Sequence, residues 1–512
     1  MKTVFLAILL LGGLHNFVEA QLITHWVNPN GEATGTFGQS LDLNHSFAII
    51  GDPKASGATD STGEAYIYDL KNLSSKPVLI LDPSDLAKND RFGSAVALTD
   101  SFAFVGAERV DYADSTDLGR VFIYKYQNGK WDYYSELSVP DTLSSGMRFG
   151  AALAADKNHL LVGAPGAANY DGIQQIGMAF LYTLKNGKWT YTENLYRSLP
   201  VEREHYGYTV DIHDSISVIG MLGYGLSPKP DEAQVFTKYP SQEYWRHSFA
   251  LSEQNSRYNQ HYGIAVAAYG DRVFVGADED EVAGDTLNTY GLVYVYRDSS
   301  GTWVKQDTLG PASGRQSFEK FGIAMGIYKN TAAIGAVDKD SYGAVYIFNY
   351  THGNWKQTDY LPHPDPPVNP KAYSAFGSAV KMNNSFLIVS DPTHQTKNGI
   401  YGGTVYVYDS NSLITSIYKT PVHQPGKIHL SPAYPNPFNP STNIRYKLNQ
   451  TAHVHIDIYN ILGQKVATLK NDRESAGSHL LSWKPEHLSS GVYFIKLHAS
   501  NQITVEPVTY LK

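Results

Sequence analysis

The sequence contains no cysteine among its 512 residues, so no disulfide supports the fold. Charged residues make up only 18% of the chain, and no basic block occurs. A mildly acidic chain of this kind, with a formal net charge of -8, is not expected to bind nucleic acid or an anionic membrane by charge. The chain is too long for one ordinary hydrophobic core, which predicts several domains or a repeat array.

Long apolar runs are also missing. The apolar run near the N-terminus, Val4–Leu14, is shorter than the ~20 residues that a membrane span needs. It follows Lys2 and precedes the small-residue site Val18-Glu19-Ala20, which is the pattern of a secretory signal peptide. We therefore expect residues 1–20 to be a signal peptide, and the mature chain to have no transmembrane segment.

Known catalytic motifs are absent too. The sequence has no Gly-x-Ser-x-Gly elbow, no His-Glu-x-x-His pair, no P-loop and no cysteine nucleophile. Paired carboxylates that act as acid and base have an arbitrary separation in sequence, so this arrangement stays open. The prediction is a protein that is not an enzyme. A secreted polysaccharide-active hydrolase or lyase is the alternative.

What the sequence does contain is a repeat of about 55 residues that occurs seven times. Each copy opens with an aromatic residue and a glycine, and a second glycine, or a serine in the last copy, stands thirteen residues after the first. The opening pairs are Phe37-Gly38, Phe92-Gly93, Phe149-Gly150, Tyr206-Gly207, Tyr262-Gly263, Phe321-Gly322 and Phe376-Gly377. The residues thirteen positions later are Gly51, Gly106, Gly163, Gly220, Gly276, Gly335 and Ser390. A spacing kept in every copy indicates a repeat architecture.

Each repeat has the pattern of four short strands, named A to D in chain order. In the second copy, strand A (Phe92–Leu98) is bulky on one side and nearly bare on the other, as the innermost strand in a ring of sheets needs to be. A short polar turn leads to a continuous apolar strand B (Phe102–Val105), and an alternating strand C and a Trp-containing strand D follow. The pattern predicts an all-β fold, a seven-bladed β-propeller with four antiparallel strands per blade.

The closure of the ring has two possible solutions. Leu22–Val27 lies at the right distance before the first copy to serve as a strand D, and Leu413–Tyr418 lies at the right distance after the last strand C. Either segment can complete the seventh blade.

The repeat resembles the FG-GAP family, known from the head of integrin α chains and from many bacterial exported proteins. The resemblance is carried best by Phe149-Gly150 with Gly163-Ala164-Pro165, and it covers roughly residues 36–420. It implies a propeller used for binding, often with calcium in the A–B loop. A calcium loop needs several oxygen ligands at alternate positions, whereas the A–B turns of this chain are two or three residues long. We therefore expect no cofactor, and no calcium in the loops that the family uses. The match is closer to the short-turn bacterial version of the repeat.

Variation in loop length gathers on one face of the predicted propeller. In a four-stranded antiparallel blade the A–B and C–D turns lie at one end, and the longer, variable B–C and D–A connections lie at the other. Variable loops on a rigid scaffold are where binding usually resides, and tyrosine with carboxylates suits a sugar ring or a peptide. The candidate ligand-binding residues of this loop face are Asp111, Tyr112, Tyr170, Asp171, Tyr224, Asp278, Asp280, Tyr290, Asp338, Asp340, Tyr342 and Tyr401.

Two carboxylate pairs on the loop face are weak candidates for a cation. These are Asp278 with Asp280, and Asp338 with Asp340. Neither stretch has the glycine and the distal glutamate of a recognisable calcium loop. No metal site is therefore predicted.

The C-terminal part of the chain has a different pattern. Residues 421–430 form a polar, proline-containing linker, and six or seven short alternating runs follow in residues 431–512. This pattern predicts a small immunoglobulin-like β-sandwich.

The same segment closely resembles the type A sorting domain of the bacterial type IX secretion system. The residues that carry the resemblance include Pro435, Asn436, Pro437, Phe438, Asn439, Pro440, Gly463 and Gly491. The resemblance implies export across the outer membrane, with the type IX machinery as a partner of residues 431–512, and then surface attachment or release. An accessory immunoglobulin-like domain akin to that of flagellar hook-capping proteins shares this pattern and is the alternative. The preceding signal peptide favours sorting.

The predicted organisation is a signal peptide (1–20), a propeller (21–420), a linker (421–430) and a sorting domain (431–512). The leading functional prediction is a surface or secreted binding or adhesion protein that presents its loop face to a glycan or protein ligand. A structural module of a surface layer is a further alternative.

Overall fold

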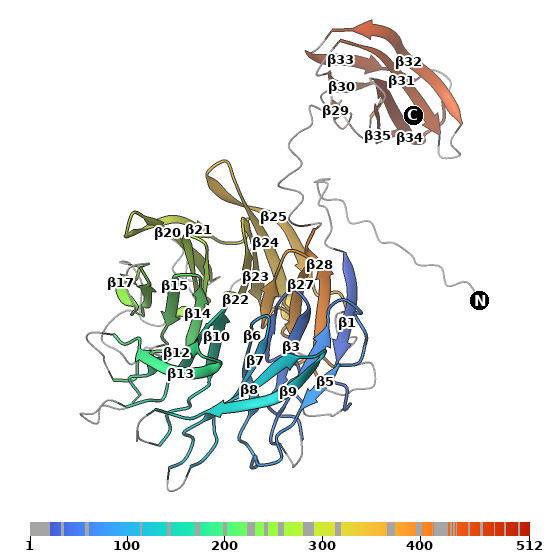
Figure 1. Ribbon diagram of the computed structural model, residues 1–512. Coiled ribbons are helices and arrows are strands. Elements are labelled where there is room, and N and C mark those ends of the chain that lie inside the picture. Colours follow the sequence, from blue (N-terminus) through green and yellow to red (C-terminus); the bar gives the residue numbers. More distant parts are fainter. Residues whose placement is uncertain are drawn as a thin grey trace. The chain divides into compact units, whose positions relative to one another are not determined.

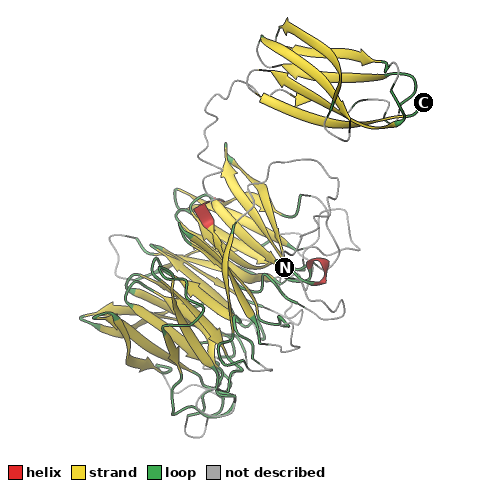
Figure 2. Ribbon diagram, turned by 90° about the vertical axis from the view of Figure 1, so that its right-hand side faces the viewer, coloured by secondary structure: helices red, strands yellow, loops and turns green. Residues whose placement is uncertain are grey.

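The computed structural model describes most of residues 21–512. The stretches outside the described residues are 1–20, 32–34, 57–60, 113–114, 141–144, 169–174, 198–201, 223–230, 240–243, 254–260, 280–290, 313–318, 366–373, 396–401, 412, 414–428, 431–432, 434–435, 437, 449–450, 461–463, 476, 486–487 and 500–501. The predicted signal peptide and most of the predicted linker fall in these stretches. The chain forms two compact units, Met1–Tyr418 and Lys419–Lys512, and both are built mainly of strands (Figures 1 and 2). The first unit also contains the short 3-10 helix η1 (Lys339–Ser341).

The described residues of the first unit form seven four-stranded antiparallel sheets. The first three, each from strand A to strand D, are β2 (Ser40–Leu43), β3 (Phe47–Asp52), β4 (Glu64–Asp69) and β5 (Leu79–Leu81); β6 (Phe92–Leu98), β7 (Phe102–Ala107), β8 (Arg120–Gln127) and β9 (Lys130–Leu137); and β10 (Ala152–Asp156), β11 (His159–Ala164), β12 (Met178–Lys185) and β13 (Lys188–Asn194). The next three are β14 (Thr209–His213), β15 (Ile216–Gly220), β16 (Ala233–Thr237) and β17 (Arg246–Leu251); β18 (Tyr262–Tyr269), β19 (Arg272–Ala277), β20 (Leu292–Ser299) and β21 (Thr302–Leu309); and β22 (Phe321–Tyr328), β23 (Thr331–Ala336), β24 (Ala344–Thr351) and β25 (Asn354–Pro362).

The seventh sheet joins the two ends of the first unit. Its strands are β26 (Val380–Met382), β27 (Phe386–Asp391), β28 (Thr404–Asp409) and β1 (Leu22–Val27). β1 pairs antiparallel with β28, and Figure 1 shows the blue β1 beside the orange β28. Of the two predicted solutions for ring closure, the structure therefore uses the N-terminal segment.

The innermost strands arrange the sheets in a ring. Each strand A contacts the strand A of the next sheet in chain order, from β2 to β26, and β26 contacts β2. The predicted strand A of the second copy has the bounds of β6, and strand B of that sheet, β7, is buried along its whole length. The all-β propeller architecture with short A–B turns is confirmed.

The hydrophobic core lies between neighbouring sheets. One cluster joins Phe104 of β7 to Phe149 and Leu160 of the next repeat, and similar clusters lie at the other sheet-to-sheet interfaces. At the closing interface, Trp26 of β1 stacks on Tyr68 of β4 with ring centroids 4.3 Å apart. Pairwise burial of this kind supports a large exported fold without disulfides.

The described residues of the second unit form two sheets that share a core. One sheet contains β29 (His429–Leu430), β30 (Thr442–Leu448) and β33 (Gly477–Trp483), and the other contains β32 (Lys465–Glu474), β31 (Ala452–Asn460), β34 (Gly491–Ala499) and β35 (Gln502–Tyr510). Ile444 and Trp483 of the first sheet pack with Ile456 and Ile495 of the second. The unit is the predicted β-sandwich.

Candidate functional site

A cavity of about 570 Å³ opens on the face of the propeller that carries the A–B turns. Its walls come from strand ends and turns of several sheets, from Leu43 and His45 of the first repeat to Asn383 of the last. The cavity has the size of a small-molecule pocket. None of its lining residues belongs to the loop face predicted from the sequence.

The cavity wall combines aromatic and polar side chains. The ring centroids of His213 and Tyr269 are 4.5 Å apart, and those of Tyr269 and Tyr328 are 5.7 Å apart. His213 and Tyr328 line the cavity, and the exposed His45 and Asp100 line it as well. Such a surface suits a ligand that has both apolar faces and hydroxyl groups.

Three titratable groups meet beside the cavity. Asp156, His213 and Asp214 bring their ligand atoms within 4.8 Å of one another. Lys157 forms an ion pair with Asp214, and Asp156 accepts a hydrogen bond from the Asp214 N–H. The hydrogen bond from Lys157 lowers the pKa of Asp214 below 3.8. Both carboxylates already have a partner within the protein. This cluster therefore connects the A–B turns of the third and fourth sheets and is not an open cation site.

A charged layer crosses the inside of the ring, and sequence analysis did not find it. The residues four positions after the opening glycines are Asp42, Ala97, Ala154, Asp211, Ala267, Gly326 and Lys381. Lys381 Nζ lies 3.9 Å from Asp42 Oδ1, and Asp42 and Asp211 accept hydrogen bonds from the N–H groups of Leu98 and Ala268 on the following strands A. An alignment of the seven copies would have revealed this layer, since charge replaces alanine or glycine there.

The charges of this layer are coupled. Burial raises the pKa of Asp42 and of Asp211 above 3.8, and the charge of Lys381 opposes this rise. Burial alone would lower the pKa of Lys381, but the two carboxylates outweigh it and raise that pKa above 10.5. The side chain of Lys381 is 41% exposed, so the inside of the ring is reached by solvent at this level.

The structure describes half of the loop-face candidates. Asp111 and Tyr112 are exposed, and the Tyr112 side chain is 67% exposed. Tyr342 is half-buried. The candidates outside the described residues are Tyr170, Asp171, Tyr224, Asp280, Tyr290 and Tyr401.

The described carboxylates of the two candidate cation pairs have partners. Asp278 is buried and lies 2.9 Å from His261 Nδ1. Asp338 lies 3.4 Å from Lys320 Nζ, and Asp340 accepts a hydrogen bond of 3.3 Å from the Tyr360 hydroxyl. A basic side chain beside Asp278 and Asp338 makes each a poorer ligand for a cation.

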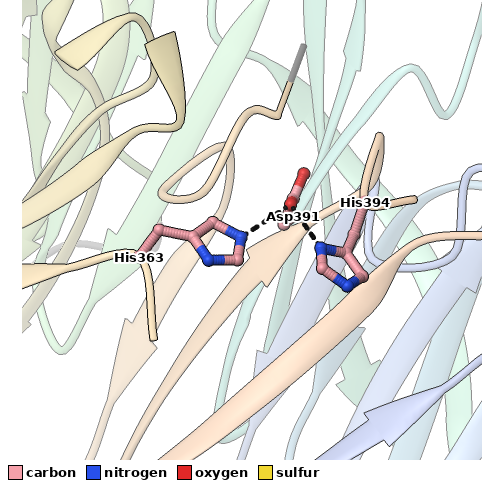
Figure 3. A group of neighbouring side chains, drawn as sticks. All are labelled: His363, Asp391 and His394. Carbon is pink, nitrogen blue, oxygen red and sulfur yellow. Dashed lines mark hydrogen bonds and ion pairs between the residues drawn. The ribbon is translucent and has the colours of Figure 1, made fainter. Parts of the chain in front are cut away.

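A buried group of His363, Asp391 and His394 lies at the loop-face end of the seventh sheet (Figure 3). His363 directly follows β25, Asp391 ends β27, and His394 follows in the B–C connection. His363 Nε2 donates to Asp391 Oδ2 at 3.0 Å, and Asp391 also accepts hydrogen bonds from the Ser374 hydroxyl and from the Ala375 N–H. Burial alone would raise the pKa of Asp391, but the hydrogen bonds from His363 and from the Ser374 hydroxyl help to hold it well below 3.8.

Sequence analysis missed this group because its members lie on two different connections. His363 and Asp391 are 28 residues apart. The available signal was Ser390-Asp391-Pro392, which matches Gly51-Asp52-Pro53 of the first copy and marks an acidic residue at the end of strand B.

The sorting-motif residues occupy the second unit. Phe438 is buried between Trp483 and Tyr510, with ring centroids 5.3 and 5.2 Å away. Asn436 Oδ1 accepts a hydrogen bond of 2.8 Å from the Thr509 N–H, and Gly491 begins β34. Asn439 and Pro440 follow Phe438 before β30, whereas Pro435, Pro437 and Gly463 lie outside the described residues. The motif thus ties the entry of the domain to its last strand.

Comparison with protein families identifies two segments. Residues 432–509 match the secretion system C-terminal sorting domain, and residues 78–124 match the FG-GAP repeat. Both resemblances seen in the sequence are confirmed. The sorting domain implies export to the cell surface or release, and an interaction with the secretion machinery. Within the described residues, no helix has the length and apolar character needed to cross a bilayer.

Solved structures with similar folds have low sequence identity to this chain. A periplasmic gluconolactonase of Pseudomonas aeruginosa has 13% identity and a TM-score of 0.37, with 85% of this chain and 98% of that chain covered. PorZ, a surface component of the type IX secretion system of Porphyromonas gingivalis, has 12% identity and a TM-score of 0.30, with 91% and 69% covered. A sialidase of Trypanosoma rangeli has 12% identity and a TM-score of 0.37, with 81% and 84% covered. A search of curated proteins found no match. Likenesses at this level carry no argument about activity.

Proposed function

For an exported propeller with a type IX sorting domain, we propose that the mature protein is a non-enzymatic binding protein that takes a carbohydrate into the cavity at the A–B turns. The observation that carries the proposal is the wall of this cavity, which is lined by the aromatic rings of His213 and Tyr328 and by the exposed polar groups of His45 and Asp100. Aromatic rings pack against the apolar faces of sugars, while carboxylate and imidazole groups bind their hydroxyls. Cell-surface or released localisation brings such a site into contact with extracellular glycans.

The loop face is the other possible location for a ligand. Tyr112 and Asp111 are exposed there, and neither residue lines the cavity at the A–B turns. Binding of a protein ligand on a flatter surface needs no cavity, so this alternative is an outcome of the test below.

The test is a glycan and extracellular-protein array probed with the mature chain, together with an assay for sugar release. Two variants are compared: His45→Ala with Asp100→Ala in the cavity, and Tyr112→Ala on the loop face. All three positions are exposed, so the substitutions are expected to change stability by less than about 0.5 kcal/mol. We expect a glycan ligand whose binding is lost in the cavity variant and kept in the loop variant.

Three results would overturn the proposal. Loss of binding in Tyr112→Ala alone would place the site on the loop face. Release of sugar by the wild-type protein would indicate an enzyme. Absence of binding to every glycan and protein would favour a structural surface-layer module.

A further inference from the structure

The group formed by His363, Asp391 and His394 is compact and shielded from solvent. His363 Nε2 lies 3.0 Å and His394 Nδ1 lies 3.4 Å from the same oxygen, Asp391 Oδ2. The side chains are 2%, 0% and 8% exposed in the order His363, Asp391, His394. Figure 3 shows the two imidazole rings on either side of the carboxylate, each with a nitrogen toward it.

The first repeat shows what the protein needs at this place for structure alone. Asp52 ends β3 as Asp391 ends β27, and it accepts a hydrogen bond of 2.6 Å from the Thr36 N–H, just as Asp391 accepts one of 2.9 Å from the Ala375 N–H. The other oxygen of Asp52 accepts a hydrogen bond of 2.9 Å from the side-chain amide of Asn28. Asn28 follows its strand D directly, as His363 does. An amide is therefore sufficient to latch the D–A connection to the end of strand B.

The third position differs even more between the two repeats. Ala55 lies three residues after Asp52, and His394 lies three residues after Asp391. Each donates its backbone N–H to the main-chain carbonyl oxygen of that aspartate, at 3.1 and 3.3 Å respectively. The first repeat thus has an amide and a methyl group where the seventh has two imidazoles. The hydrogen bond that holds the D–A connection to the end of strand B therefore does not by itself require a histidine at position 363 or at position 394.

His394 also lacks a hydrogen bond that would account for its burial. Its Nδ1 atom is buried and has no partner with hydrogen-bond geometry within the described residues, although Asp391 Oδ2 is 3.4 Å away. A buried polar atom without a partner costs the folded protein the desolvation of that atom. A ligand that accepts the lone pair of Nδ1 removes this cost.

We propose that His363 Nε2, Asp391 Oδ2 and His394 Nδ1 bind a divalent transition-metal ion of the zinc type. Two ligand atoms about 2.1 Å from a tetrahedral ion lie roughly 3.4 Å apart, close to the separations of 3.0 and 3.4 Å in this group. Two imidazoles and one carboxylate favour zinc over calcium, which prefers six to eight oxygens. The fourth position is left for water or for the Ser374 hydroxyl, which already contacts Asp391 Oδ2. The site lies at the opposite end of the sheets from the A–B turns and does not depend on the proposed cavity.

Metal binding requires one rearrangement of a proton. The Asp365 N–H donates to His363 Nδ1 at 3.0 Å, so the neutral ring carries its proton on Nε2 in the metal-free protein. When Nε2 binds the ion, this proton moves to Nδ1 and the bond from the Asp365 N–H is lost. Asp365 is exposed, so its N–H exchanges this hydrogen bond for one to water, which keeps the cost small. Zinc binding to a structural site is strong enough to outweigh the loss of this one hydrogen bond.

The test uses the full mature chain and a variant that copies the first repeat of the same protein. His363→Asn with His394→Ala gives the seventh repeat the residues of the first, so the latch to Asp391 is kept while both imidazoles are removed. Zinc and cobalt are titrated into the metal-free protein by calorimetry and absorption spectroscopy. We expect one ion per chain for the wild type, and a loss of affinity of more than about 100-fold in the variant, because even residues that merely support metal ligands contribute 10–100-fold.

A second variant tests whether zinc binds at the Asp156 cluster instead, and a spectrum of the wild-type complex identifies the ligands directly. His213→Ala removes the histidine of the Asp156 cluster and is expected to leave zinc affinity unchanged. X-ray absorption of the wild-type zinc complex is expected to show two imidazole ligands, and this result does not depend on whether the double variant folds. Full zinc affinity in the folded double variant, loss of binding in His213→Ala, or no binding of either ion by the wild type would each overturn the proposal.

Discussion

At the scale of single residues, the thirteen-residue step has a direct physical cause. A Cβ atom added to Gly163 would lie 2.1 Å from the backbone oxygen of Gly207 in the next repeat. The other second glycines meet the opening glycine of the following repeat in the same way, and only glycine permits this approach of two backbones. Ser390 is the exception at the closing interface, where its Oγ accepts a hydrogen bond of 3.0 Å from the Ala379 N–H.

This contact predicts a large effect of one methyl group. Gly163→Ala is expected to destabilise the propeller by more than about 3 kcal/mol, because the obstructing atom is backbone and cannot move aside alone. Ser390→Ala, at the equivalent position that already carries a Cβ, is expected to cost about 1 kcal/mol for the lost hydrogen bond. Urea unfolding of both variants checks the difference. Equal stabilities would show that the two sheets do not approach as closely as described.

Two histidines at one repeat position are expected to titrate in opposite directions. The hydrogen bond with Asp278 raises the pKa of His261 above 6.5, whereas burial lowers the pKa of His205 below 6.5. The contribution of His261 to stability is thus present below pH 6.5 and lost as the pH rises through its folded pKa. The contribution of His205 is present above pH 6.5 and lost as the pH falls through its folded pKa. NMR titration of the two rings measures both values, and pKa values in the reverse order would contradict the described contacts.

At the scale of strands, the charged layer of Asp42, Asp211 and Lys381 is a contact among three innermost strands. Lys381→Met leaves two partly buried carboxylates without their cation, and we expect a loss of about 1–3 kcal/mol at pH 7. This lies between the values for exposed and for fully buried ion pairs, because solvent reaches Lys381.

The sign of the pH dependence and a matched control separate charge from packing. Since the pKa values of both carboxylates are raised, their protonation begins above 3.8, and the deficit of Lys381→Met is expected to shrink as the pH falls through that range. Adding Asp42→Asn and Asp211→Asn keeps acceptors for the two strand N–H groups and is expected to restore stability at pH 7. Thermal melts of the single and triple variants across this pH range decide the matter. A deficit that does not change with pH would indicate lost packing.

Strand patterns were predicted well from the sequence, whereas contacts between repeats were not. The alternation of bulky and small residues in Phe92–Leu98 is local, so β6 was predicted with its observed bounds. The cavity, the charged layer and the His363 group each combine residues from different repeats. The residue pattern within one repeat does not indicate which residues of another repeat lie close to it in the fold. The contact between the second glycine of one repeat and the opening glycine of the next is likewise not evident from the sequence, which shows only the constant thirteen-residue spacing within each repeat.

At the scale of the whole molecule, the N-terminal strand β1 closes the ring. Trp26 of β1 is fully buried against Tyr68, while Ile23 on the same strand is 40% exposed. Trp26→Ala is expected to destabilise the propeller by about 3–5 kcal/mol, and Ile23→Ala by less than about 0.5 kcal/mol. Chemical denaturation of the two variants tests this closure. Similar stabilities would mean that the seventh sheet does not depend on β1.

We propose the cavity at the A–B turns as the binding site of this exported propeller. Amide hydrogen exchange of the mature protein, measured with and without the glycan found on the array, tests it most directly. Bound glycan is expected to slow exchange at the turns around Asn44, Ser101 and Asn158, and to leave exchange in the segments around Tyr112 and Tyr342 unchanged. Protection at Tyr112 and Tyr342 without protection at the turns would contradict it.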